Sequence, residues 1–258
     1  MGILNDKSIA SLKNITDAVN DRGNYKWYDL DRDLSNEQTD CILNSIQKAP
    51  FKAYPFYDQT DLLQFPHSVS HSDYLKIALT NSEQGQLIKQ YIWANISITE
   101  DNDTWVWSKE DLEIYKNFVS EQYKAIFDNP TELIKRNNTQ LFAPLVILYF
   151  QKECNSYDDG PSCSKGVNLG VMATSALWCG MSMGLHNTFC GCINYAQVDT
   201  KMFDELNRLL GISNNFKLSL MSCHGYSYIK NKVKASATIK EKRERSLGPS
   251  IHTKIKKY

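Results

Sequence analysis

The sequence lacks several features that would point directly to a class of protein. Its first twenty residues mix charged and apolar side chains and contain no basic and apolar secretory signal, so we expect a cytoplasmic protein. Its 258 residues show no internal repeat. No convincing Ser-His-Asp or Cys-His constellation is present, so the sequence does not favour nucleophilic catalysis.

A regular cysteine framework is also missing. The seven cysteines are Cys41, Cys154, Cys163, Cys179, Cys190, Cys192 and Cys223. Because their number is odd and the chain is fairly long, we expect reduced, mostly buried thiols. A zinc site would need Cys190 and Cys192 together with Cys179, His186 and Cys223, but Cys-x-Cys alone lacks the paired spacing of a zinc ribbon. The sequence therefore favours no metal.

Lys, Arg, Asp and Glu are absent from residues 166–194, the longest weakly charged run in the chain. The run is rich in small residues and ends in a dense Gly/Cys turn, which predicts a buried helix leading into a tight loop. It is long enough to cross a bilayer, so a single membrane span is the rival interpretation. Its Gly, Ser, Thr and Asn content and the polar sequence on both sides favour the buried helix.

Charge is balanced overall but unevenly spread. The net charge is zero, whereas residues 228–258 contain ten Lys or Arg against two Glu, which leaves 19 basic against 27 acidic residues elsewhere. A basic tail on an acidic body indicates an anion site or attraction between subunits, and a solvated tail is the alternative. The 42% hydrophobic and 22% charged composition is that of a globular protein.

Hydrophobic periodicity and capping patterns predict helices packed around a modest sheet, an α+β fold. Ser35 and Gln38 form a capping box, and Gly211 ends a later helix. The expected helices cover residues 5–21, 35–48, 82–95, 108–126, 131–135 and 200–210, besides the uncharged helix, and the expected strands cover 74–80, 141–150 and 216–223.

A cationic turn follows the first predicted helix. In Arg22-Gly23-Asn24-Tyr25-Lys26, two cations flank a Gly-Asn turn. Arg and Lys form strong charge-assisted hydrogen bonds to phosphate, so this turn is a candidate phosphate site.

These motifs, in this order, resemble the nitroreductase family of FMN-dependent oxidoreductases over residues 8–250. Residues 22–26 stand where the family has an Arg-x-Ser-x-Arg/Lys turn that grips the flavin phosphate. Residues 34–38 and the exit at Ala49-Pro50 match the family's next helix. Gly184-Leu185 and the Phe189–Cys192 turn match its glycine loop beside flavin N5, and Arg243-Glu244-Arg245, or Lys242, its C-terminal cations.

The resemblance implies a single nitroreductase-like domain over residues 1–258, with a mixed central sheet, an inserted loop at 51–73 and a C-terminal extension, 228–258, that packs on a partner subunit. It implies a homodimer that binds FMN and passes hydride from NADH or NADPH through flavin N5 to a nitroaromatic or quinone. No side chain is then needed as a catalyst. The implied cofactor-binding residues are Arg22, Gly23, Asn24, Lys26, Pro50, His71, Cys190, Gly191, Arg243 and Arg245.

The sequence departs from the family after Pro50, where Phe51-Lys52 and an insertion replace the usual Ser and Asn/Gln-Pro-Trp. His71 then falls at the Asn/Gln place, and its ring can donate or accept a hydrogen bond. This departure leaves a flavin-binding protein without NAD(P)H turnover as one alternative. A nucleic-acid-binding protein that uses its basic tail is another, although the tail has few interleaved aromatic residues.

Overall fold

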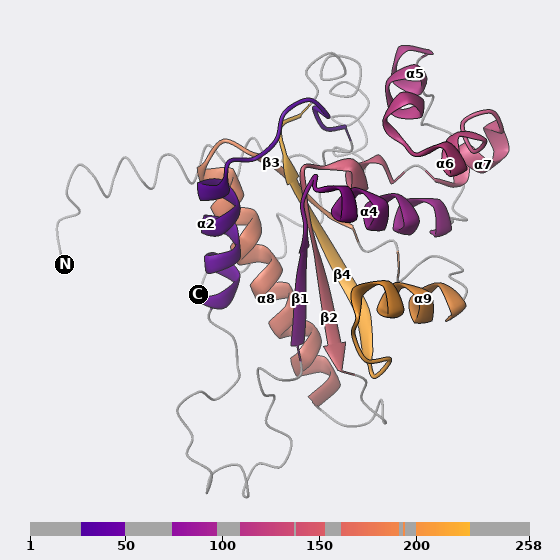
Figure 1. The fold of residues 1–258 in the computed structure, drawn as a ribbon. Helices are drawn as coiled ribbons and strands as arrows, with labels where there is room; N and C mark the ends of the chain where they lie inside the picture. Colours follow the sequence, from indigo (N-terminus) through magenta and orange to yellow (C-terminus); the bar gives the residue numbers. More distant parts are fainter. Residues whose placement is uncertain are drawn as a thin grey trace, which may run out of the picture.

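The computed structural model describes residues 27–49, 74–96, 109–136, 138–152, 161–190, 193 and 200–227. There the chain forms one four-stranded sheet with helices on both faces (Figure 1). The expected helix at 5–21, the inserted loop at 51–73 and the tail at 228–258 lie outside the described residues. The helices are α2 (Asn36–Gln47), α4 (Glu83–Asn95), α5 (Lys109–Phe118), α6 (Glu121–Lys124), α7 (Pro130–Lys135), the 3-10 helix η2 (Thr139–Phe142), α8 (Pro161–Ser182) and α9 (Thr200–Leu210).

The strands are β1 (Tyr74–Leu79), β2 (Leu145–Lys152), β3 (His186–Cys190) and β4 (Phe216–Gly225). Their order across the sheet is β1-β2-β4-β3, and every neighbouring pair is antiparallel. The expectation of a mixed sheet is thus wrong for the described strands. Burial patterns indicate which face of a strand is covered, but they do not reveal the direction in which a strand runs.

Strand β2 lies at the centre of the fold. Its first six residues are all buried, because helices cover both faces of the sheet. Val146, Leu148 and Phe150 join one core cluster, and Leu145, Ile147 and Tyr149 join the other. Opposite Tyr149 and Phe150 the register with β4 shifts by one residue, so the partner strand bulges there. The near-continuous apolar run predicted this central strand.

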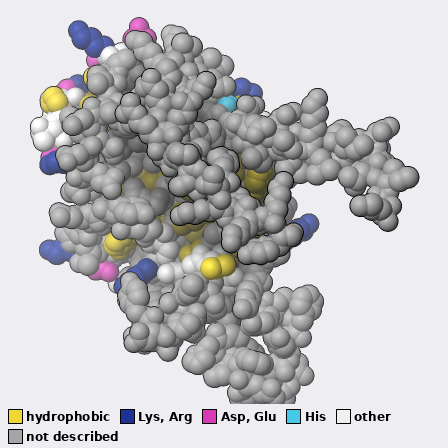
Figure 2. Space-filling model, turned by 180° about the vertical axis from the view of Figure 1, so that it is seen from behind, with side chains coloured by type: hydrophobic (Ala, Val, Ile, Leu, Met, Phe, Trp, Pro, Cys, Tyr) yellow, Lys and Arg dark blue, Asp and Glu magenta, His cyan; other side chains and the backbone are white. Residues whose placement is uncertain are grey.

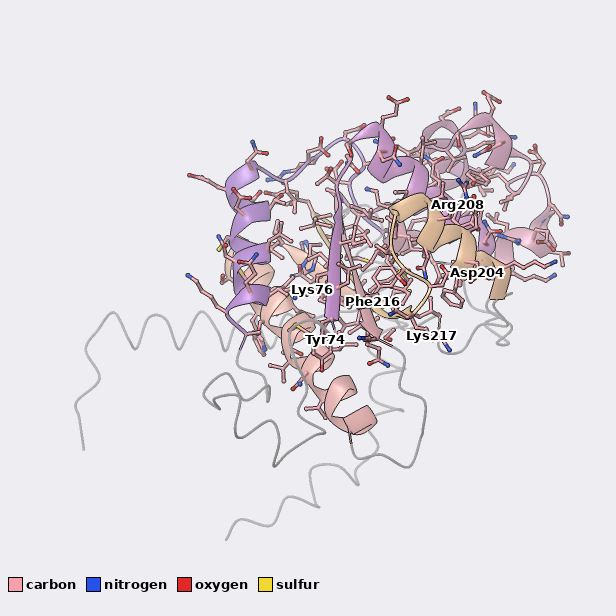
Figure 3. The ribbon with its side chains drawn as sticks, turned by 60° about the horizontal axis from the view of Figure 1, so that its bottom comes forward. Tyr74, Lys76, Asp204, Arg208, Phe216 and Lys217 are labelled. Carbon is pink, nitrogen blue, oxygen red and sulfur yellow. The ribbon has the colours of Figure 1, made fainter. Side chains whose placement is uncertain are left out.

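Two layers of helices cover the sheet. Helices α2 and α8 pack together and cover one face, and α4, η2 and α9 lie on the other (Figure 1). Viewed from below, Tyr74 and Lys76 mark the start of β1, Phe216 and Lys217 mark the start of β4, and α9 carries Asp204 and Arg208 (Figure 3). On the side opposite Figure 1, Lys and Arg side chains of described residues lie mainly near the margins of the view (Figure 2).

Capping patterns located three helices correctly. The Ser35 side chain accepts a hydrogen bond from the Gln38 N–H, and the Gln38 side chain accepts one from the Ser35 N–H, which forms the predicted capping box of α2. Ser82 caps α4 through the Gly85 N–H. Gly211 follows α9 with φ +66°, a left-handed conformation that glycine adopts without a Cβ penalty.

Three expected boundaries are wrong. The predicted helix over 108–126 breaks at Val119-Ser120 into α5 and α6. The expected strand over 141–150 begins only at Leu145, because η2 and Pro144 precede it, and proline cannot donate a ladder hydrogen bond. The turn expected after the uncharged helix contains strand β3, which pairs with β4.

Helix α8 contains most of the uncharged run, and it is only partly buried. Leu169, Met172 and Ala173 pack under α2 against the sheet. On its outer side, however, Val167 is 57% exposed and Trp178 is 37% exposed. A fully buried helix was expected because the run has no charge, but apolar residues also occur on surfaces. Among the described residues, no helix combines the length and apolarity needed to cross a membrane.

Candidate functional site

The described chain begins and ends at one place on the sheet. Tyr28, near the first described residue, forms an antiparallel bridge with Ser227, the last one. The Asp29 N–H donates to the Tyr226 carbonyl at 2.8 Å. We call these four residues the entry–exit junction. Tyr28 is 1% exposed, and its hydroxyl donates to the Cys223 carbonyl of β4 at 3.2 Å, so the core fixes the junction.

The junction adjoins both cationic segments of the sequence. Residues 22–26 immediately precede the first described residue, and the basic tail at 228–258 immediately follows the last. The two segments are far apart in the chain, but both are attached to the sheet at the junction. The two positions at which these segments join the described chain, residues 27 and 227, therefore lie close together on the sheet.

His186, the first residue of β3, connects the entry–exit junction to this strand. The Ser227 N–H donates to His186 Nδ1 at 3.0 Å. Because Nδ1 accepts this hydrogen bond, the proton of the neutral ring lies on Nε2. The sequence suggests His186 only as a zinc ligand, whereas in the structure it accepts a hydrogen bond from Ser227, the last residue before the basic tail.

Arg32 is a further cation beside the junction that the sequence did not indicate. Its guanidinium carbon lies 3.3 Å from the centre of the Tyr226 ring, a cation–π contact. The Tyr226 hydroxyl in turn accepts a hydrogen bond from Gln38 Nε2 of α2 at 2.9 Å. Arg32 stands ten residues after Arg22, outside any recognisable motif, so only the folded arrangement reveals it.

A chain of buried polar side chains crosses the sheet on the α8 face. Tyr149 and Ser222 approach to 3.0 Å between hydroxyl oxygens, and Ser222 Oγ lies 2.8 Å from His224 Nε2. His224 Nδ1 lies 2.5 Å from Asn187 Oδ1. These residues come from β2, β4 and β3, so the chain joins three neighbouring strands.

The direction of every hydrogen bond in this chain follows from its last member. Asn187 Nδ2 donates to the Leu185 carbonyl at 3.0 Å, so its Oδ1 accepts from His224 Nδ1–H. The neutral ring then accepts at Nε2 from Ser222, which accepts from Tyr149. Burial lowers the pKa of His224 to about 3, in agreement with a neutral ring.

Ser222, His224 and Asn187 are hydrogen-bonded in the order of a nucleophilic triad, but a substrate has no access to them. Ser222 and His224 are both 0% exposed, so a substrate carbonyl cannot reach the serine hydroxyl. The helix above leaves no room either, because a Cβ at Gly180 would lie 2.5 Å from Asn187 Oδ1. The set is a satisfied core network that fixes β3 against β4 and α8.

Lys89 of α4 is a buried amine on the opposite face of the sheet. It is 1% exposed, and its Nζ donates to the Ala143 carbonyl at 2.9 Å and to Asn81 Oδ1 at 2.6 Å. Burial lowers the pKa of Lys89 to about 7, against smaller opposing effects of Cys223 and Asp33. The sequence does not indicate a lysine whose pKa lies near physiological pH.

Of the cofactor-binding residues expected from the sequence, the structure describes only Cys190, the last residue of β3. It is 2% exposed and disulfide-bonded, so the expectation of reduced thiols is wrong there. Cys41, Cys179 and Cys223 carry free thiols. The remaining expected site residues lie outside the described residues: Arg22, Gly23, Asn24, Lys26, Pro50, His71, Gly191, Arg243 and Arg245.

The structure separates the cysteines that were considered for zinc. Cys179 packs in the cluster under α2, whereas Cys190 and Cys223 lie in the cluster on the other face of the sheet. Within the described part of the chain, no three His, Cys, Asp or Glu side chains stand close enough to share a metal ion.

Similarity to known proteins is confined to three-dimensional structure. No protein-family model matches the chain, and no curated protein matches it by sequence. The FMN-dependent nitroreductase NfnB from Mycobacterium smegmatis, solved with NADPH, superposes with a TM-score of 0.53 at 14% identity, over 87% of this chain and 92% of that one. A nitroreductase with bound FMN from Desulfitobacterium hafniense superposes with a TM-score of 0.50 at 13% identity, over 83% and 89%.

The chain has the nitroreductase-like fold. A third structure agrees, the FMN and NADPH-dependent nitroreductase NfnB from sphigopyxis sp. strain HMH, with a TM-score of 0.50 at 13% identity over 84% of this chain and 89% of that one. This α+β architecture was expected from the order of motifs. Identity this low establishes the nitroreductase-like fold alone and assigns no role to any single residue.

Proposed function

We propose that the protein is an FMN-dependent oxidoreductase that passes hydride from NADH or NADPH to an electron-poor acceptor such as a nitroaromatic or quinone. The entry–exit junction is the observation that carries this proposal, because one cationic segment directly precedes it in the sequence and the other directly follows it. Bound flavin would supply the hydride chemistry, and the chain would supply binding and orientation.

The proposed phosphate ligands come from both sides of the junction. Arg22 and Lys26 precede Tyr28, and Arg243 and Arg245 belong to the tail after Ser227. A phosphate monoester carries nearly two negative charges and forms strong hydrogen bonds with guanidinium groups, so cations from two segments suit it. Gly191, directly after β3, would place a backbone N–H against the flavin ring, since glycine permits close approach.

We further propose that the protein is a homodimer. Helix α8 presents a stripe of uncharged residues to solvent at helical spacing, Val167, Gly170, Thr174 and Trp178. Its opposite side is packed in the core, so the stripe remains for a partner. A twofold interface uses the same patch on both subunits, which an uncharged stripe can provide without pairing like charges.

The absorption spectrum of the purified protein tests the cofactor proposal. We expect flavin bands, either as purified or after FMN is added, together with oxidation of NADH or NADPH in the presence of an acceptor. A yellow protein that oxidises neither nucleotide would instead be a flavin-binding protein without turnover. A colourless protein that ignores added FMN would contradict the proposal, and salt-sensitive affinity for nucleic acid would then favour the basic-tail alternative.

Two substitutions test the proposed phosphate ligands. Arg22→Ala and Arg243→Ala should each weaken FMN retention at least tenfold, about 1.4 kcal/mol, because each removes a charge-assisted hydrogen bond. Arg208→Ala is the matched control, since the Arg208 side chain is exposed and pairs with Glu205 on α9. FMN titration by fluorescence quenching measures the affinities. Unchanged retention in both variants would show that the assignment is wrong.

The cytoplasmic location stays a prediction from sequence.

A further inference from the structure

Two free thiols face each other between helices α2 and α8. The Sγ atoms of Cys41 and Cys179 lie 3.2 Å apart, although 138 residues separate them in the sequence. A disulfide holds its sulfurs at about 2.0 Å, so the two atoms need to approach by only roughly 1 Å. Both residues lie on helices that pack directly against one another, which keeps the pair together without help from a loop.

The two thiols differ in accessibility, and this difference orders their reactions. Cys41 is exposed, whereas Cys179 is partly buried at the α2–α8 contact. Burial, followed by the neighbouring Cys41 thiol, raises the pKa of Cys179 to about 11, so Cys179 remains protonated near neutral pH. An oxidant from solvent therefore meets Cys41 first, and Cys179 is placed to react with the oxidised sulfur.

We propose that Cys41 and Cys179 form a dithiol site that a hydroperoxide oxidises to a disulfide between α2 and α8. In the first step the Cys41 thiolate attacks a peroxide oxygen. The S–O bond forms, the O–O bond breaks, and the released hydroxide or alkoxide takes a proton to become water or an alcohol, which leaves a sulfenic acid on Cys41. The sulfur is oxidised by two electrons, and the peroxide is reduced by the same two.

In the second step Cys179 attacks the Cys41 sulfur. The S–S bond forms, the S–O bond breaks, and the leaving hydroxide takes the Cys179 proton as water. Overall, two thiols and one hydroperoxide give one disulfide, one water and the water or alcohol of the peroxide. A dithiol reductant reverses the reaction by exchange. None of these steps requires the flavin, so this site is independent of the proposed oxidoreductase function.

The remaining described thiol explains why the reaction is selective. Cys223 is 0% exposed and lies in the core cluster on the opposite face of the sheet from Cys179. Burial raises its pKa well above the usual range of a thiol, which suppresses the reactive thiolate. Peroxide should therefore leave Cys223 reduced while it oxidises the pair.

Peptide mapping of the full chain tests the proposal. The protein is treated with a slight excess of hydrogen peroxide, blocked with iodoacetamide and digested without reductant. We expect one new peptide that links Cys41 to Cys179, which disappears after dithiothreitol. The cross-link closes a long loop, so oxidation should also raise the thermal unfolding midpoint, and dithiothreitol should reverse the rise.

Single substitutions separate the two steps. In Cys179→Ser, Cys41 has no resolving thiol and should proceed to the sulfinic acid, which adds two oxygens to its peptide and resists dithiothreitol. In Cys41→Ser, oxidation at this site should be several-fold slower and give no linked peptide. Cys223→Ser is the thiol control and should keep the link. If it does not fold, labelling of Cys223 in the wild type only after denaturation serves instead.

The proposal is overturned if wild-type Cys41 reaches the sulfinic acid as fast as in Cys179→Ser, since Cys179 would then not act on it. A disulfide that links Cys41 to a different cysteine would overturn it equally.

Discussion

His224 and Lys89 are bases held in an apolar core, and burial lowers the pKa of each. Both side chains have hydrogen-bond partners in the core. The neutral His224 ring bonds to Ser222 and Asn187. The Lys89 amine donates to Asn81 and to a backbone carbonyl. At the scale of single residues, the two groups therefore make stability depend on pH, in two separate windows.

For His224 we expect stability to fall as the pH falls from about 6.5 towards 3. The folded pKa is about 3 against the ordinary value of 6.5, so the unfolded chain binds the extra proton throughout this window. The loss approaches about 1.4 kcal/mol per pH unit and totals on the order of 4 kcal/mol. Urea unfolding at several pH values measures it, and His224→Gln should flatten the slope. An NMR titration that shows the His224 ring charging near pH 6 would contradict this prediction.

For Lys89 the window lies at higher pH. Its folded pKa is about 7 against the ordinary 10.5, so the unfolded chain binds more protons between these values, and this residue makes stability rise with pH from about 7 to 10. The gain is on the order of 4 kcal/mol, as for His224, because the two shifts are of the same size. Lys89→Met should remove the rise in chemical denaturation curves, whereas the exposed Lys201→Met should preserve it. Equal slopes in wild type and Lys89→Met would show that the amine stays charged in the fold.

At the scale of residues, the sequence indicates which polar side chains share a face of a strand, but not which residues of other strands they bond to. The alternation of β4 places Ser222 and His224 on the same face of the sheet, two residues apart, and that pattern was available from the sequence. Asn187 was not, because its strand β3 was expected to be a loop. Most residues of the expected flavin site lie outside the described residues, so their roles stay predictions.

At the scale of elements, the capping box of α2 offers a defined test. Ser35→Ala removes the side-chain oxygen that accepts from the Gln38 N–H, so we expect a loss of about 1 kcal/mol and a thermal midpoint lower by about 2–4 °C. Ser213→Ala, at an exposed loop position, should change the midpoint by less than half as much. Differential scanning calorimetry compares the two variants. Equal midpoints for both would mean that the cap contributes nothing measurable.

Elements with a local signal could be predicted, and elements defined by their partners could not. The caps of α2 and α4 and the glycine after α9 act within one helical turn, so the sequence shows them directly. The break between α5 and α6 depends on Gln90, whose side-chain oxygen accepts hydrogen bonds from the Ser120 N–H and hydroxyl across the fold. Likewise β3 exists through its pairing with β4, which no local pattern reveals.

At the scale of the whole molecule, the stripe on α8 connects the fold to the proposed function. The face of α8 towards α2 and the sheet is packed, and the opposite face exposes Val167 and Trp178. A lone tryptophan on a surface is ordinary, but an uncharged stripe with Gly170 and Thr174 at the intervening turns allows two copies to approach closely. The same helix leads into β3 and the expected glycine loop, so dimerisation and flavin binding would share one structural element.

We therefore expect the wild-type protein to be a dimer and Trp178→Glu to be a monomer. Two copies of a 29.6 kDa chain give roughly twice that mass by light scattering. The new carboxylate would be desolvated against its symmetry mate, which costs several kcal/mol in an apolar interface. Leu87→Glu, at an exposed apolar position on α4, is the matched control and should remain dimeric.

A monomeric wild type at micromolar concentration would contradict the dimer, and a dimeric Trp178→Glu would place the interface elsewhere. If the two subunits share the flavin site, the monomeric variant should also lose FMN. A monomeric variant that retains FMN would show that the interface adds stability without forming part of the flavin site.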